Sequence, residues 1–97
     1  MAQIALSRRA QADLDRLFEF VVAGDAGVAD ESIRAILEAI EVLKRHPFIG
    51  RLAGDELREL VISRGKSGYI ALYEYLRAYD LVRILAIRHQ REAGYAG

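Results

Sequence analysis

Residues 69–95 read YIALYEYLRAYDLVRILAIRHQREAGY, and this stretch decides the fold. Two runs rich in strand-forming residues, YIALYEYL (69–76) and LVRILAIR (81–88), flank the short polar segment RAYD. Their alternation predicts two antiparallel strands joined by a turn. The second strand is expected to place Val82, Ile84, Ala86 and Arg88 on one face, with Arg83 on a partly covered opposite face. A polar tail follows, carrying Arg88, His89, Arg91, Glu92 and Tyr95.

The chain before this hairpin predicts one short strand and two helices. QIAL (3–6) is expected to form a strand, and Ser7 can cap the following helix with its hydroxyl. The apolar residues of that helix recur at helical spacing: Ala10, Leu14, Leu17, Phe18 and Val21. Asp13 is assigned to another face. A second helix carries its own apolar stripe, formed by Ala29, Ile33, Ile36, Leu37, Ile40 and Leu43, and should end at His46 because Pro47 follows.

Between the helices and the hairpin, HPFIGRLAGDE (46–56) predicts an ordered loop, LRELVIS (57–63) a strand, and RGKSG (64–68) a tight connection. The element order is therefore β-α-α-β-β-β. It predicts an α+β fold in which the N-terminal strand and a helical hairpin pack on a small, mainly antiparallel sheet. Residues 1–97 are expected to form a single domain. The first strand must lie at an edge or beside the last strand, and its spacing does not distinguish these positions.

Composition limits the function classes. The 97 residues include no cysteine and two histidines that lack metal-ligand spacing, so no metal, disulfide or cofactor is expected. The 14 basic and 14 acidic residues balance, which argues against binding nucleic acid through net charge. No segment has the length of a membrane span or the pattern of a signal peptide, so we expect a soluble, cytoplasmic protein. The hydrophobic content of 53% indicates either a partner-facing apolar surface or alanine-rich packing.

Several segments, taken in order, resemble one family. They are LSRRAQADLDRL (6–17), HPFIGR (46–51), LREL (57–60), GYIALYEY (68–75) and VRILAIRHQREAGY (82–95). Together they are similar to the ParE/RelE superfamily of type II toxins over nearly the whole chain. No single motif carries the resemblance; the succession of motifs does.

The resemblance implies a toxin that a cognate antitoxin neutralises. The two would form a hetero-oligomer in which an antitoxin segment, disordered when free, folds on the toxin. RelE-like members cut messenger RNA in the ribosome, whereas ParE-like members inhibit DNA gyrase. Gyrase inhibition is favoured here, and ribosome-dependent RNA cleavage is the alternative. A module that binds its antitoxin but has lost toxicity is the third hypothesis.

RelE-like nucleases carry basic residues in the strand that corresponds to 57–63, an arginine near the start of the next strand, and a basic residue with a tyrosine after the last. In this chain Arg58 is the cation within the first of these segments, and Ile70 replaces the arginine. His89 and Tyr95 stand at the terminal positions. The resemblance thus assigns His89, Arg58 and Tyr95 as catalytic only if the chain is a nuclease, and the incomplete set favours gyrase inhibition.

Four cations are candidates for binding the target or the antitoxin: Arg88, Arg91, Arg64 and Lys66. Arg88 and Arg91 could instead be solvated and paired with Glu92, and Arg64 and Lys66 could be ordinary turn residues. We expect Arg88, His89 and Arg91 to share one cationic corner where the last strand ends.

Several of these side chains also have structural interpretations. His89 could bond only to backbone or to Glu92, and Arg58 could bond Glu74 or Glu59 across strands. Tyr95 either docks on the core or acts in the site. The tyrosines of the hairpin could stack on bases or pack against the helices; these are Tyr69, Tyr73 and Tyr75.

Overall fold

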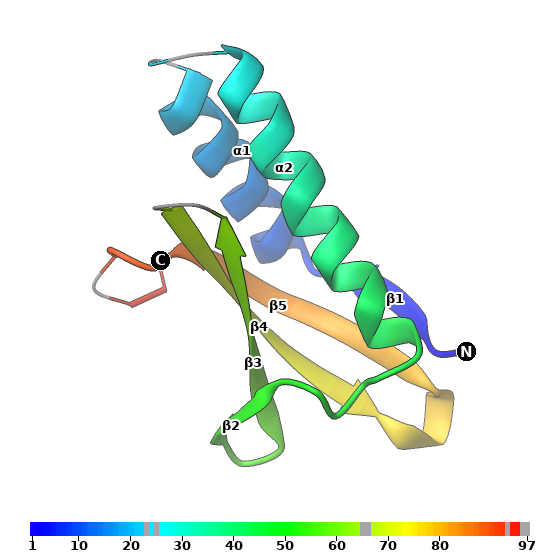
Figure 1. Ribbon diagram of the computed structural model, residues 1–97. Helices are drawn as coiled ribbons and strands as arrows, with labels where there is room; N and C mark the ends of the chain where they lie inside the picture. The colour runs from blue at the N-terminus through cyan, green and yellow to red at the C-terminus, as the bar shows by residue number, and fades with distance from the viewer. Residues whose placement is uncertain (23, 25, 65–66, 93, 96–97) are drawn as a thin grey trace.

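The computed structural model describes residues 1–22, 24, 26–64, 67–92 and 94–95. Figure 1 shows a helical hairpin lying across one face of a curved sheet. The elements are β1 (Gln3–Leu6), α1 (Arg8–Val22), α2 (Ala26–Glu41), the 3-10 turn η1 (Val42–Lys44), β2 (Arg51–Gly54), β3 (Leu57–Arg64), β4 (Ser67–Leu76), the 3-10 turn η2 (Arg77–Tyr79) and β5 (Leu81–His89).

The sheet of the described residues has five strands in the order β1-β5-β4-β3-β2. β1 runs parallel to β5, and the other neighbours are antiparallel. The predicted α+β fold is therefore confirmed, with its mainly antiparallel sheet. The open question about the first strand is also answered, because β1 lies both at an edge and beside β5.

β2 is a strand that the sequence analysis assigned to the loop at 46–56. Its four residues are all exposed, so no alternation of buried and exposed positions marks it in the sequence. Its pairing with β3 shifts register between Leu52 and Gly54. The connection predicted at 64–68 is shorter than expected, because Arg64 belongs to β3 and Ser67 begins β4.

The predicted cap of α1 is confirmed, since the Ser7 hydroxyl accepts the Ala10 amide at 3.0 Å. Asp13, which the sequence places on another face than the apolar stripe, is nevertheless buried. Asp13 is only 4% exposed, and its carboxylate accepts the Ile87 amide of β5 at 2.8 Å. α2 ends earlier than predicted, at Glu41, and continues as the η1 turn before His46.

A β-bulge at Leu85 changes the faces predicted for β5. Leu72 pairs with Ala86 and Tyr73 pairs with Ile84, so Leu85 is an extra residue. Its carbonyl accepts the Ser7 hydroxyl at 3.0 Å. Beyond the bulge the alternation inverts: Ile87, not Ala86, continues the face of Val82 and Ile84, because Ile87 pairs with Ala71.

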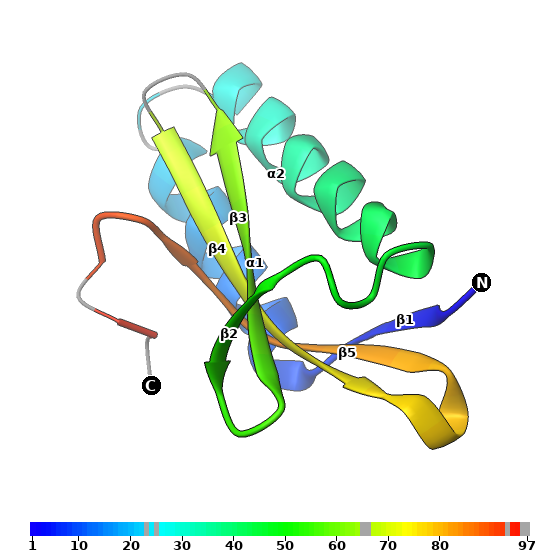
Figure 2. The same ribbon diagram turned by 60° about the horizontal axis from the view of Figure 1, so that its bottom comes forward.

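The sheet thus has two faces with different cover. The helix face carries the core side chains Ile62, Tyr69, Tyr73 and Ile84, all at most 5% exposed. The tyrosines Tyr69 and Tyr73 therefore pack in the core, whereas Tyr75 is only half-buried. In Figures 1 and 2 the turn between β2 and β3 and the turn between β4 and β5 extend beyond the helices. At this end no described helix covers the helix face.

Candidate functional site

The residues after β5 fold back over the outer face, the sheet face opposite the helices. Arg88 pairs with Ile70 there, and its guanidinium lies 5.2 Å from the centre of the Tyr95 ring. The same guanidinium donates to the Glu92 carbonyl at 3.0 Å. Arg88 therefore holds its own tail in place through one guanidinium nitrogen, while its buried Nε forms no hydrogen bond.

Tyr95 docks on Glu59 of β3, which is the structural role left open by the sequence. Its hydroxyl donates to the Glu59 carboxylate at 2.6 Å, and Arg51 contacts the other carboxylate oxygen at 3.1 Å. The Tyr95 hydrogen bond, followed by the Arg51 contacts, holds the pKa of Glu59 below its ordinary value. Burial, with the Glu59 carboxylate beside it, raises the pKa of the Tyr95 hydroxyl. A phenol bonded to a carboxylate and resistant to ionisation is a poor proton donor to a leaving group.

His89 lies on the helix face, paired with Tyr69, and the two rings meet edge to face at 5.3 Å between centroids. Its Nδ1 accepts the Arg91 amide at 3.0 Å, and its own amide donates to Glu92 at 2.9 Å. These are the backbone and Glu92 bonds of the structural interpretation. The imidazole thus terminates β5 and orders the turn that follows.

Two charged side chains of α1 bind this end of β5 and the turn after it. Asp13 binds the Ile87 amide, and Arg16 bonds Glu92 at 3.0 Å. Burial raises the pKa of Glu92, but the His89 amide and Arg16 outweigh it, so the net pKa is lowered. Neither Asp13 nor Arg16 was predicted to act here, since only the folded sheet brings α1 to β5. We call Arg88, His89, Arg91, Glu92 and Tyr95 the C-terminal corner.

Arg58 forms hydrogen bonds that the sequence did not predict. It contacts neither Glu74 nor Glu59; it donates to the carbonyls of Phe48 at 3.0 Å and Gly50 at 2.7 Å. Glu74 pairs instead with Arg83 at 3.3 Å, and Arg83 is exposed on the face that the sequence predicted to be partly covered. Arg58 therefore organises the loop between η1 and β2.

The buried Tyr73 hydroxyl fixes the same loop from below. It accepts the Gly50 amide at 2.8 Å and donates to the Pro47 carbonyl at 2.9 Å. A Cβ at position 50 would lie 2.6 Å from the Tyr73 ring, so only glycine allows this approach. Burial raises the pKa of Tyr73, which keeps the hydroxyl protonated for both bonds.

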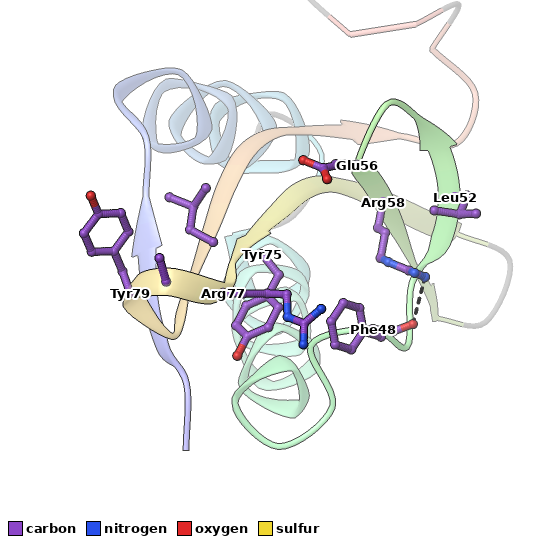
Figure 3. A pocket seen from close by; sticks show the side chains of 9 residues that line it. Phe48, Leu52, Glu56, Arg58, Tyr75, Arg77 and Tyr79 are labelled. Carbon is purple, nitrogen blue, oxygen red and sulfur yellow. Dashed lines mark hydrogen bonds between the residues drawn. The ribbon is translucent and has the colours of Figure 1, made fainter.

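The loop forms one wall of an open groove of about 480 Å³ at the end of the sheet that the helices leave bare. Figure 3 shows its main lining residues and Arg77 extending over it from η2. We call this the Phe48 groove, lined chiefly by Phe48, Leu52, Arg58, Tyr75, Arg77 and Tyr79. The sequence alone does not predict this groove, because the aromatic residue in HPFIG resembles any loop residue until its exposure is known.

The candidate nuclease residues do not converge. Arg58 pairs with Tyr73 and His89 with Tyr69, four residues apart on β4, which separates them by roughly 13 Å along the strand. Tyr95 lies on the opposite face through its bond to Glu59. The expectation that Arg88, His89 and Arg91 share one cationic corner was wrong for the first two: Arg88 points to the outer face and His89 to the helix face, because neighbours in a strand alternate.

The remaining cations add little to a common site. Arg91 is exposed, and Arg64 lies in β3 near the turn. Lys66 lies outside the described residues. Within the described ranges, no cluster of His, Asp or Glu is arranged to hold a metal ion. The helices that the structure describes are also too short or too polar to cross a membrane.

Comparisons with known proteins agree with this architecture. Residues 4–94 match the model of the family described as the ParE toxin of the type II toxin-antitoxin system parDE. The chain is 37% identical over 93 residues to Toxin RelE3 of Caulobacter vibrioides, covering 95% of this chain and 98% of the relative.

Two solved structures share the fold. One is described as the chromosomal ParDE toxin-antitoxin system from P. aeruginosa; it superposes with a TM-score of 0.75 at 22% identity, covering 90% of this chain and 94% of that chain. The other is the intact E. coli RelBE toxin-antitoxin complex, with a TM-score of 0.64 at 15% identity, covering 100% and 99% of the two chains. At these identities the likeness concerns the fold alone.

Proposed function

We propose that this chain, which belongs to the ParE toxin family of type II toxin-antitoxin systems, poisons its target by binding it, and that the target is DNA gyrase. Under this proposal residues 1–97 act as one toxin domain in the cytoplasm. A cognate antitoxin neutralises it by folding on its surface. Support for that partner comes from the structural relatives, which are described as a ParDE system and a RelBE complex.

One observation carries the choice of binding over cleavage: the residues that a nuclease would need are apart and already engaged. Cleavage of RNA through the 2′-hydroxyl needs a base, cations around the phosphate and a proton donor within reach of one phosphodiester. Arg58 bonds two loop carbonyls, and Tyr95 bonds Glu59 on the other face. His89 stands roughly 13 Å from Arg58 along β4. Such a set supports no concerted acid-base step.

Ribosome-dependent RNA cleavage is the second candidate, because the curated relative at 37% identity is named Toxin RelE3. A ribosome could supply groups that the chain lacks. Loss of toxicity with retained antitoxin binding is the third candidate.

The test compares two assays on the purified chain. We expect inhibition of supercoiling by gyrase at concentrations that leave in vitro translation intact, because the proposed mechanism needs no attack on RNA. His89→Ala should inhibit as the natural chain does. Codon-biased cleavage of mRNA only when ribosomes are present, abolished by His89→Ala, would establish the nuclease instead. Inactivity in both assays with antitoxin binding retained would leave the third candidate.

A further inference from the structure

The Phe48 groove exposes large apolar side chains that a folded protein usually hides. Phe48 is 52% exposed, Leu52 69% and Tyr79 77%, and they line one concavity. A gathering of exposed apolar groups that polar residues surround is a mark of an interaction surface. Aromatic residues and arginine are also the types that dominate binding energy at protein interfaces.

The frame behind these side chains is rigid. Tyr73 and Arg58 together make four hydrogen bonds to the backbone of residues 47–50. On the other wall, the Tyr75 hydroxyl donates to Asp80 at 2.6 Å, which holds the β4–β5 turn. Phe48 and Tyr75 meet edge to face at 5.2 Å between centroids. Tyr73, Arg58 and Tyr75 thus use their polar groups to hold the apolar side chains in place, and such preorganisation lowers the entropy cost of binding.

The charge of the groove favours an acidic partner. Arg77 is exposed, and its guanidinium forms no hydrogen bond or salt bridge with the residues that the structure describes. Arg58 adds a second cation, placed 5.2 Å from the centre of the Phe48 ring. Against these two arginines, Glu56 is the single carboxylate among the lining residues described. A carboxylate from the partner beside Arg77 would complete the pairing.

The shape favours a helix over an added strand. β2, the edge beside the groove, has four residues and an irregular register, features that protect an edge against strand addition. The groove instead lies over the bare end of the helix face, where another helix would continue the helical layer. An amphipathic helix places apolar side chains at i, i+3 and i+4 into such a groove.

We infer that the Phe48 groove is the surface by which this toxin grips its target protein, and that it receives an amphipathic helix carrying a carboxylate beside its apolar stripe. This rests on the proposed function as an inhibitor that acts by binding. A small rigid groove suits a folded target, whereas a disordered antitoxin segment gains most from a long surface that it can wrap. A second, larger groove of about 660 Å³ along β1 and α2, with Met1 and Leu37 among its lining residues, offers the antitoxin such a surface.

The test compares groove variants with matched controls from exposed positions outside it. The groove variants are Phe48→Ala, Arg77→Glu and their combination. Ile49→Ala is the apolar control, because Ile49 is 57% exposed in the same loop but does not line the groove. Arg9→Glu, at an exposed position of α1, is the charge control. If the double variant does not fold, as judged by circular dichroism, Arg77→Glu alone at its exposed site carries the test.

Each protein is measured for growth arrest when expressed alone, for inhibition of supercoiling by purified gyrase, and for affinity to the protein encoded by the neighbouring upstream reading frame. We expect the double variant to need on the order of tenfold more toxin for the same inhibition and arrest, with unchanged antitoxin affinity. The controls should match the natural chain.

Undiminished arrest by the double variant would overturn the inference. So would loss of antitoxin affinity, which would assign the groove to the antitoxin. If the natural chain arrests growth without affecting gyrase, gyrase as the target is wrong, while the growth assay still decides the role of the groove. If the natural chain does not arrest growth at all, both proposals are overturned.

Discussion

The C-terminal corner and the Phe48 groove stand at opposite ends of β4, and they use arginine in opposite ways. At the corner, Arg88 holds the tail through the Glu92 carbonyl and the Tyr95 ring, and Arg16 reaches across to Glu92. At the groove, Arg58 binds the carbonyls of the loop that exposes Phe48, and the Arg77 guanidinium has no hydrogen-bonding partner in the described chain.

The difference shows why a cluster of charges in a sequence is a weak indicator of a site. The corner collects the residue types of a nuclease, yet Arg88 binds backbone carbonyls of the tail and Glu92 binds Arg16 and the His89 amide. The groove has fewer charges, but its buried hydroxyl and arginine stabilise an arrangement that leaves aromatic surface uncovered. Apolar side chains that a hydrogen-bonded loop holds exposed to solvent are a stronger sign of a binding surface than a cluster of charges. Four substitutions test this contrast between the corner and the groove.

The largest effect is expected at the support of the corner. Asp13→Ala removes the buried carboxylate that binds the Ile87 amide and leaves that amide unsatisfied. The free energy of unfolding should fall by about 3 kcal/mol in urea titrations. Asp15→Ala, on the exposed side of the same helix, is the matched control and should change it by no more than about 0.5 kcal/mol. Equal effects of the two substitutions would mean that the Asp13 bond does not brace β5.

A smaller loss is expected behind the groove. Tyr73→Phe removes the hydroxyl that bonds Pro47 and Gly50, so stability should fall by about 1.5 kcal/mol because the buried Gly50 amide loses its acceptor. Tyr75→Phe, which removes one bond to Asp80, should have a much weaker effect on urea unfolding. If Tyr73→Phe leaves both stability and target inhibition unchanged, the loop is not held as described.

The contribution of the C-terminal corner to stability should depend on pH. The lowered pKa of Glu59 means that this group stabilises the fold above its ordinary value of 4.5, and the contribution disappears as the pH falls through the lower pKa of the folded state. Tyr95→Phe removes the main cause of the shift. The stability difference between the natural chain and this variant should therefore be greatest at pH 7 and should shrink by pH 3, as measured by urea unfolding at both values. A difference independent of pH would show that the Tyr95–Glu59 bond is not linked to ionisation.

Much of the fold follows from the sequence because its signals are local. The helical stripes, the Ser7 cap and the alternation in β4 each reflect the period of a single element. β2 has no such period, since all four of its residues are exposed. The bulge at Leu85 was also hidden, because it depends on Ser7 and Asp13, which only the folded chain brings to β5.

The candidate site was predicted less well, for a related reason. Sequence order brought Arg88, His89 and Arg91 together, but strand alternation separates Arg88 from His89. Arg58 was recognised as special, yet its carbonyl partners lie in a loop whose conformation depends on Tyr73. The partners of a long side chain are set by tertiary contacts, which neither periodicity nor resemblance supplies.

The smallest effect is expected from His89→Ala, which should not change the inhibition of gyrase. This variant supplies the most direct test. Supercoiling inhibition by purified gyrase would be titrated for the natural chain, His89→Ala and the Phe48→Ala/Arg77→Glu double variant. Recognition at the groove predicts that His89→Ala inhibits as the natural chain does, while the double variant needs on the order of tenfold more protein. Loss of inhibition by His89→Ala with full inhibition by the double variant would contradict the account.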